Sequence, residues 1–513
     1  MSLANQIEKE RKWTVMVYFA SDNDLEGFAL ENINMMKQVG STDEVAILAE
    51  LDPSGIGQTK RFYVRDNNST IEEDAIMSFG ETNTGDPASL KNFIEWGKAN
   101  FEAAHYLVVL WGHGHGWQSE DNANRAAGRT VNIVRGKGNK FTLRSDKNAE
   151  GEEQLVVKVF LSKDAAGQFR IRGVEEEITD PSLSGFLLDE KSNDVLTMDE
   201  LSEALKTVGK VDILGMDACL MAMAEVGYQV KDLAHILVGS EETIPDASWP
   251  YDRILKKLVA NPAMSPRDFS VQIAREYIIH YQAKSKQVAM SACNLERAEA
   301  LAQALADLVK ELIKAKEKVS YEVMRSRAMA QTFYIKDYVD LYDFCRLLRE
   351  NCAEPDIQAK ALVVMKVIGV GENPAGFVID YGYYGFSKRD SHGVSVYFPC
   401  KDASVSYVNN QFAQAADWAE FLACYVGMAT AETSRNHTAT ATGIDSGLKV
   451  KTGDEVKVKT GDEGKVKTGD EGKIPGSMSM RIPQSEPAGD RPDRASAGLS
   501  QSKQGEMQTT TPS

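Results

Sequence analysis

Two short segments carry the side chains with the clearest chemical potential. WGHGHGW (111–117) follows the apolar run LVVL, and MDACLM (216–221) follows VDIL; they contain His113 and Cys219. A thiol becomes a good nucleophile at neutral pH beside a base or a cation, and imidazole can be that base. If the two apolar runs are neighbouring strands, both side chains emerge at one sheet edge. The glycines around His113 let a peptide approach closely, and the Gly114 amide is well placed to stabilise an oxyanion.

Each of these residues also has an ordinary structural interpretation. A cysteine at a strand end is more often a small buried apolar residue than a nucleophile. A histidine between glycines is more often a loop residue than a base. The joint occurrence of Cys219 and His113 after two apolar runs moves the balance toward catalysis and leaves the two interpretations about level.

A metal site is a further alternative for the histidine segment. His113 and His115 lie at alternate positions, which share one face of a strand, and both could bind zinc through imidazole. The hydrolase pattern H-x-H-x-D-H would need Asp and His where this chain has Trp117 and Gln118. His235 is distant in sequence but could approach in space. We predict no metal, and a metal-dependent hydrolase ranks behind the other interpretations.

Asp217 precedes Cys219 by two residues, so strand alternation places both on the cleft side. A carboxylate beside a thiol raises the thiol pKa, because it disfavours the thiolate. That cost is reasonable if Asp217 has another task, such as receiving a cationic substrate side chain. The structural alternative is that Asp217 caps a helix beginning in CLMAMAEV. The two roles are compatible.

The composition narrows the class of protein. The chain has 513 residues and a net charge of −17, which argues against a general nucleic-acid binder. No apolar run of about 18 residues is present to span a membrane. The first residues lack the apolar core of a signal peptide, so we expect a cytoplasmic protein, or a secreted one if a leader has been removed. Six scattered cysteines without a C-x-x-C pair indicate neither a disulfide framework nor a zinc ribbon.

Apolar runs alternate with amphipathic stretches from residue 13 to about 256, which predicts an α/β fold with a mostly parallel sheet flanked by helices. In such folds the site lies at the carboxyl ends of the strands. Asp22 or Asp24 is expected to cap the helix after the first strand, and Thr197 with Glu200 forms a capping-box pattern. The expected strands are 13–20, 44–52, 60–64, 105–112, 211–218 and 235–240.

The predicted domain organisation has three parts. Residues 1–260 form the core, interrupted by an insertion at 119–193 that starts as a basic loop and continues as a small hairpin or meander. Residues 261–426 form a mainly helical subdomain with returning strands and a last helix near 410–425. The tail, 427–513, contains KVKTGDEG repeats and no aromatic residue, so it is expected to be disordered.

Three motifs together resemble the clostripain family of cysteine peptidases, which has the caspase-like fold of clan CD. They are WGHGHGW, MDACLMAMAEV and LVGSEETIPDASWPY. The resemblance implies a caspase-like core, with His113 in the histidine motif and Cys219 as the nucleophile. Asp217 is similar to the acidic residue that helps to select Arg or Lys at P1, and Glu242 and Asp246 are further candidates for that pocket.

The resemblance also implies an activity. The chain would be a cysteine endopeptidase that cleaves peptides or proteins after Arg or Lys, with the amides of Gly114 and Cys219 holding the oxyanion. Such enzymes are typically activated by self-cleavage after the histidine motif, here within 119–193. Calcium dependence varies in the family; no calcium loop is recognisable, so calcium is unsupported and no cofactor is required by the sequence. The oligomeric state is open.

A different class of function is an inactive peptidase-like binding module tethered by the tail. Intact His113 and Cys219 argue against it.

Overall fold

The computed structural model describes residues 11–54, 58–117, 186–192, 194–369, 375–400 and 403–425, together with four short strands between 131 and 174. These residues belong to one compact unit, 1–444. The tail that we expect to be disordered lies outside the described residues. No helix within the described ranges is long and apolar enough to cross a membrane. The domain boundaries expected from the sequence stay a prediction.

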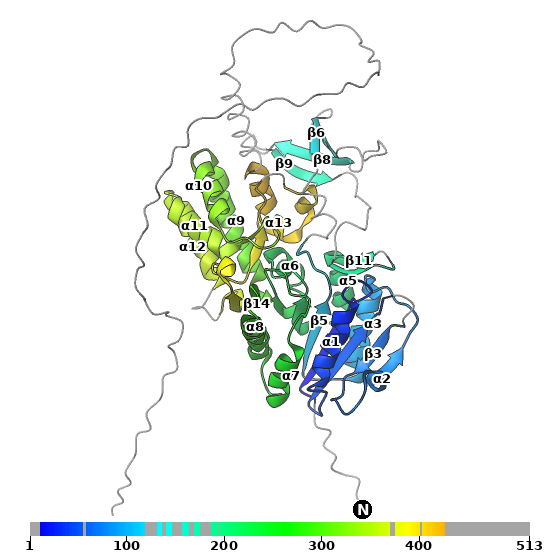
Figure 1. The fold of residues 1–513 in the computed structure, drawn as a ribbon. Helices are drawn as coiled ribbons and strands as arrows, with labels where there is room; N and C mark the ends of the chain where they lie inside the picture. Colours follow the sequence, from blue (N-terminus) through cyan, green and yellow to red (C-terminus); the bar gives the residue numbers. More distant parts are fainter. Residues whose placement is uncertain are drawn as a thin grey trace, which may run out of the picture. The chain divides into compact units, whose positions relative to one another are not determined.

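A large sheet forms the centre of this unit (Figure 1). Strands β2, β1, β5, β12 and β13 run parallel, while the strands at both edges pair antiparallel. The prediction of a mostly parallel sheet is therefore confirmed. In spatial order the strands are β16 (Val378–Tyr384), β14 (Val288–Asn294), β13 (Ala234–Gly239), β12 (Val211–Asp217), β5 (His105–Trp111), β1 (Trp13–Phe19), β2 (Val45–Leu51), β3 (Lys60–Tyr63) and β4 (Ala75–Ser78).

Helices cover both faces of the sheet because its strands are apolar on both sides. In β1, Val15 and Val17 join the core formed with α1, α7 and α8, whereas Met16 and Tyr18 join the core formed with α3 and α5. The capping box predicted for Thr197 is present at the start of α5. These helices are α1 (Glu26–Lys37), α3 (Pro87–Asn100), α5 (Met198–Val208), α7 (Tyr251–Ala260) and α8 (Pro266–Ala283).

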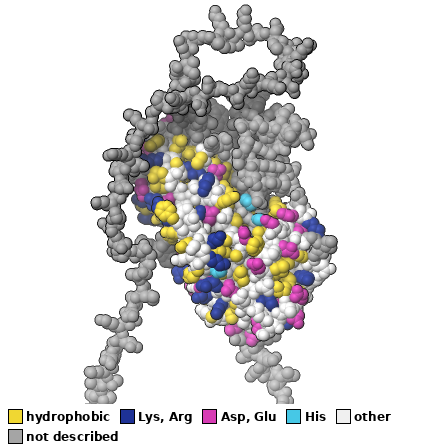
Figure 2. Space-filling view, viewed as in Figure 1, with side chains coloured by type: hydrophobic (Ala, Val, Ile, Leu, Met, Phe, Trp, Pro, Cys, Tyr) yellow, Lys and Arg dark blue, Asp and Glu magenta, His cyan; other side chains and the backbone are white. Residues whose placement is uncertain are grey.

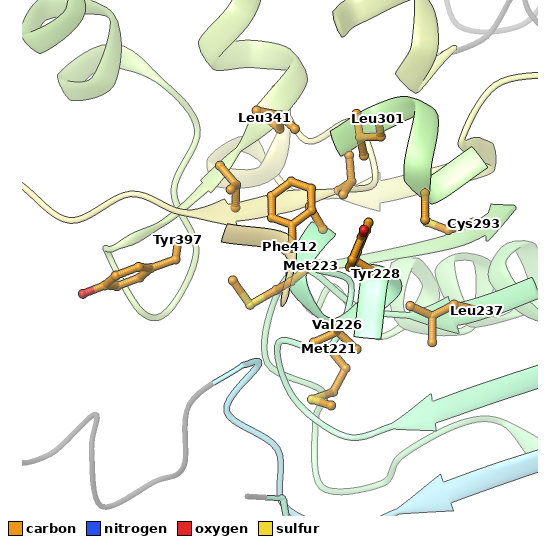
Figure 3. Close-up of a cluster of buried hydrophobic side chains, with 14 of the residues drawn as sticks. Met221, Met223, Val226, Tyr228, Leu237, Cys293, Leu301, Leu341, Tyr397 and Phe412 are labelled. Carbon is orange, nitrogen blue, oxygen red and sulfur yellow. The ribbon is translucent and has the colours of Figure 1, made fainter. Parts of the chain in front are cut away.

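The C-terminal part is mainly helical, as expected, and shares the core of the sheet. Its strands β14 and β16 extend the central sheet beyond β13. Figure 3 shows Met221, Met223 and Val226, which follow Cys219, packed in one apolar cluster with Tyr228 and Phe412. The segment after Cys219 is therefore anchored in the core. The helices involved are α6 (Ala224–Gln229), α9 (Ala298–Lys314), α10 (Lys316–Met329), α11 (Leu341–Asn351), α12 (Pro355–Ile368), α13 (Gln411–Ala415) and a last helix at 418–425.

Smaller elements complete the description. In the insertion, β6 to β9 form the antiparallel meander expected from the sequence, although β6 occupies part of the segment that we interpreted as a basic loop. The remaining elements are α2 (Ile71–Asp74), η2 (Leu295–Arg297), η3 (Phe386–Lys388), η4 (Val405–Asn409), β6 (Val131–Arg135), β7 (Lys140–Ser145), β8 (Val156–Lys163), β9 (Phe169–Val174), β10 (Phe186–Asp189), β11 (Asp194–Leu196), β15 (Tyr338–Asp340) and β17 (Ser395–Tyr397).

Candidate active site

The two segments with chemical potential leave the sheet side by side. β5 and β12 are parallel neighbours, and Trp111 lies opposite Asp217 in the register. The Gly112 N–H donates to the Asp217 carbonyl at 3.3 Å, which extends the pairing beyond the strand ends. His113 and Cys219 therefore follow neighbouring strands at one edge of the sheet, as the sequence predicted.

Gly114 allows the two backbones to touch. A β-carbon at this position would lie 2.7 Å from the Cys219 carbonyl oxygen and 2.9 Å from its nitrogen, which no real side chain tolerates. Among the described residues, neither the Gly114 nor the Cys219 N–H is engaged in a hydrogen bond. Two adjacent amides without acceptors are the donors that a developing oxyanion needs.

The Cys219 thiol is held by the backbone of Ile244. The Ile244 N–H donates to Sγ at 3.2 Å, and the Ile244 carbonyl lies 3.8 Å from Sγ. Burial raises the pKa of Cys219 to about 11, against the opposing effect of the Ile244 N–H, and the nearby carboxylates of Asp217, Glu242 and Asp246 raise it further. The resting thiol is therefore protonated, and its proton must leave when substrate is attacked.

His113 is paired with a carboxylate that the sequence analysis assigned elsewhere. Its Nε2 lies 2.7 Å from Oδ1 of Asp24, in the loop after β1. The prediction that Asp22 or Asp24 caps α1 is wrong: the N-cap is Leu25, without a side-chain cap. Asn23 instead accepts the Leu25 N–H. The available signal was that Asp24 follows β1, the strand beside β5, at the same sheet edge.

Replacing Asp24 by Asn should lower kcat for peptide cleavage about tenfold, equivalent to ~1.4 kcal/mol, with little change in KM. The reason is that a hydrogen-bonded carboxylate orients the imidazole ring and sets its tautomer. Steady-state kinetics on a fluorogenic peptide would measure both parameters. Asp43→Asn, an exposed position in the turn before β2, is the matched control. An unchanged kcat in Asp24→Asn would contradict this positioning role.

Asp217 ends β12 as a buried acceptor. Its Oδ2 accepts from the Ser248 hydroxyl at 2.5 Å, the Tyr251 hydroxyl at 2.8 Å and the Trp249 N–H at 3.2 Å. The helix-cap interpretation is wrong, because α6 begins at Ala224. Burial raises the pKa of Asp217 to about 7, although these hydrogen bonds oppose the rise. Its other oxygen, Oδ1, is buried and has no hydrogen-bond partner in the described ranges.

The other two pocket candidates differ in their surroundings. Glu242 is buried and forms an ion pair with Lys388 of η3, so its charge is already matched. Asp246 is exposed, and its charge acts on the Cys219 thiol. Lys388 was missed by sequence reasoning, and nothing in the local sequence connects it with a residue so distant along the chain.

The histidines proposed as metal ligands do not gather. His235 lies near the start of β13, whose Ala234 is opposite Val211 at the amino end of β12. His113 follows the carboxyl end of β5, so the two lie at opposite ends of the sheet. The His235 ring instead pairs with Glu296 at 2.9 Å.

The α/β sheet carries a cysteine and a histidine at the carboxyl ends of neighbouring strands. This arrangement is typical of cysteine peptidases with a caspase-like fold. Residues 17–139 and 175–425 match the model of the clostripain family, Peptidase_C11. The chain belongs to this family.

Individual relatives support the fold. The chain is 27% identical to clostripain from Hathewaya histolytica over 288 residues, which cover 51% of this chain and 44% of that protein, so the match spans less than half of the relative. Among solved structures, a secreted C11 cysteine protease from Bacteroides thetaiotaomicron with an irreversible peptide inhibitor is 20% identical, with a TM-score of 0.52. An inactive zymogen C11 protease from Parabacteroides distasonis is 16% identical, with a TM-score of 0.54. Each match covers 80% of this chain and 99% of the solved chain.

Proposed function

We propose that this chain is a cysteine endopeptidase that cleaves after Arg or Lys. The observation that carries the proposal is that Cys219 and His113 follow the ends of neighbouring strands, with the amides of Gly114 and Cys219 free of acceptors among the described residues. Family membership supports the same chemistry.

The reaction follows from the arrangement. The Cys219 proton passes to His113 as Sγ attacks the substrate carbonyl carbon, and the carbonyl oxygen becomes an oxyanion. The amides of Gly114 and Cys219 donate to that oxyanion; one such donor typically contributes about 3 kcal/mol in the transition state. His113 then protonates the leaving amine as the C–N bond breaks. Water, deprotonated by His113, hydrolyses the thioester and restores the thiol.

The P1 pocket is assigned to the region around Asp217. Within the part of the chain that the structure describes, its Oδ1 and the hydroxyl of Tyr277 are both buried without hydrogen-bond partners. Tyr277 packs against Tyr281 with the ring centroids 4.8 Å apart, and the Tyr281 hydroxyl donates to the carbonyl of Ser248, whose own hydroxyl donates to Asp217. A buried carboxylate oxygen without a donor is costly, and a substrate guanidinium or ammonium would satisfy it.

Fluorogenic peptides that differ only at P1 test this function. Peptides with Arg or Lys should be cleaved at least about 100-fold more efficiently than the norleucine peptide, which has a similar length and no charge. Equal cleavage of all three would contradict the assigned pocket. If the protein cleaves none of the three peptides, even after limited trypsin cleavage within 119–193 and with its fold intact, the binding-module interpretation replaces the peptidase.

Activation by self-cleavage within 119–193 is the second part of the proposal. The segment is rich in Arg and Lys and directly follows the histidine motif. A solved relative is described as an inactive zymogen, which fits latency in a related chain. Mass spectrometry after long incubation should find cuts in 119–193 for the wild type and none for Cys219→Ala. A fully active enzyme with an intact segment would refute activation there.

A further inference from the structure

A second group of acidic side chains lies outside the proposed catalytic centre. Carboxylate oxygens of Asp22, Asp52 and Glu81 lie within 4.8 Å of one another. Asp22 follows β1 and Asp52 follows β2, so both emerge at the carboxyl edge of the sheet that also carries His113 and Cys219. Figure 2 shows acidic side chains gathered over the N-terminal elements on this face of the molecule, beside histidine side chains.

Two oxygens of the group lack donors. Asp22 is 3% exposed and Asp52 is fully buried, yet Oδ2 of each has no hydrogen-bond partner among the described residues. The second oxygen of Asp52 accepts from the Thr59 hydroxyl at 2.5 Å, which fixes that side chain. Unpaired carboxylate oxygens out of water cost free energy unless a donor or a cation reaches them.

The surrounding charges do not balance the group. Asp189 adds a fourth carboxylate nearby, and its own oxygens are satisfied by Thr84 and Ser192. Lys191 is the cation that acts on Asp22, and it is already paired with Glu81. Burial, reinforced by the neighbouring carboxylates, raises the pKa of Asp22 to about 6 and that of Asp52 to about 7. The described residues therefore leave an excess of negative charge in a largely buried space.

We propose that Asp22, Asp52 and Glu81 bind a divalent cation. The ligand set consists of carboxylate oxygens, the donors preferred by hard cations such as Ca²⁺, Mn²⁺ and Mg²⁺. The three ligands come from separate loops, which explains why no contiguous cation-binding motif is visible in the sequence. The alternative to a cation site is that the three carboxyl groups share protons with one another and bind no cation.

The position of the group gives the cation a structural task. Asp22 is two residues from Asp24, which pairs with His113. The Asp22 carbonyl accepts the Glu190 N–H at 2.9 Å, and the Asn23 amide donates to the Leu188 carbonyl at 2.7 Å. A cation held by Asp22 and Asp52 would fix this loop from its other side and so stabilise the position of Asp24.

The binding test uses the full-length Cys219→Ala protein, freed of metal with EDTA and dialysed at pH 8. Isothermal titration with CaCl₂, MnCl₂ or MgCl₂ should show one saturable site for at least one of these salts. Asp22→Asn and Asp52→Asn should each weaken that binding at least tenfold. The same salt should raise the Tm of the Cys219→Ala parent and leave the Tm of these two variants unchanged. Asp43→Asn, an exposed position, should bind as the parent does.

Circular dichroism without metal shows whether each variant folds. If a buried variant does not, Glu81→Gln, on the more exposed ligand, gives the same comparison. No saturable binding to the parent, or undiminished binding to the folded ligand variants, would overturn the site in favour of shared protons. The assay contains no substrate and no nucleophile, so its failure leaves the proposed peptidase untouched, and failure of the peptidase leaves the cation site untouched.

Discussion

Replacing Cys219 by Ala should lower kcat/KM for an Arg peptide at least about 10⁴-fold. The variant lacks the thiol that attacks the substrate, and only water remains as a nucleophile. Continuous fluorescence assays on the wild type and the variant measure the loss. Cys400→Ala is the matched control, since Cys400 is a free and exposed cysteine, and it should keep full activity. Activity retained in Cys219→Ala would contradict the cysteine mechanism.

The pH dependence of alkylation is a second test of the role of Cys219. Because burial raises the pKa of Cys219 to about 11, little thiolate exists at pH 7 in the free enzyme. Inactivation by iodoacetamide should therefore be slow at pH 7 and accelerate about tenfold per pH unit up to pH 9. Rapid inactivation that does not change with pH would show that the resting thiol is already ionised.

Replacing Asp217 by Asn should lower kcat/KM for Arg and Lys peptides roughly 30- to 5000-fold, the equivalent of ~2–5 kcal/mol for losing one partner of a desolvated charge pair. The norleucine peptide should be affected little. Asp43→Asn, which removes an exposed charge far from the strand ends that carry Cys219, is the control. Equal losses on charged and neutral peptides would refute a role in specificity.

The pH dependence of binding sharpens this test. The pKa of Asp217 is raised to about 7 by burial, so the carboxyl group is neutral below that pH and charged above it. A P1 cation binds the charged form, so KM for the Arg peptide should rise as pH falls below 7. Asp217→Asn should lose this dependence. Because Asp217 also accepts three hydrogen bonds, thermal unfolding of the variant must be measured in parallel.

The sequence was sufficient for the parts of the site that depend on strand order. Apolar runs marked β5 and β12, and the rule that parallel strands end at one edge placed His113 beside the segment of Cys219. The pairing of Asp24 with His113 was not predicted, because an acidic residue before a helix resembles a helix cap. Only the three-dimensional course of the loop turns Asp24 toward His113. The ion pair of Glu242 with Lys388 was not predicted, because it joins segments that only tertiary packing brings together.

The same limit applies to the edges of the sheet. β14 and β16 have the composition of strands, but a local pattern does not show which sheet an antiparallel strand joins. β14 pairs with β13 and β16 pairs with β14, and α8, a distant segment in the sequence from β16, packs on all three strands. Likewise, β6 is short and flanked by basic residues, so its charge concealed its strand character.

The pairing of β5 with β12 decides what a cut in the insertion would produce. His113 lies before the insertion and Cys219 after it, so cleavage would place the two on separate polypeptides. Five residue pairs, from Leu107–Ile213 to Trp111–Asp217, and the apolar layers on both faces of the sheet would keep those polypeptides together without a covalent link. The cut enzyme would run as two bands after denaturation and as one particle before it, and neither chain alone would contain a complete active site.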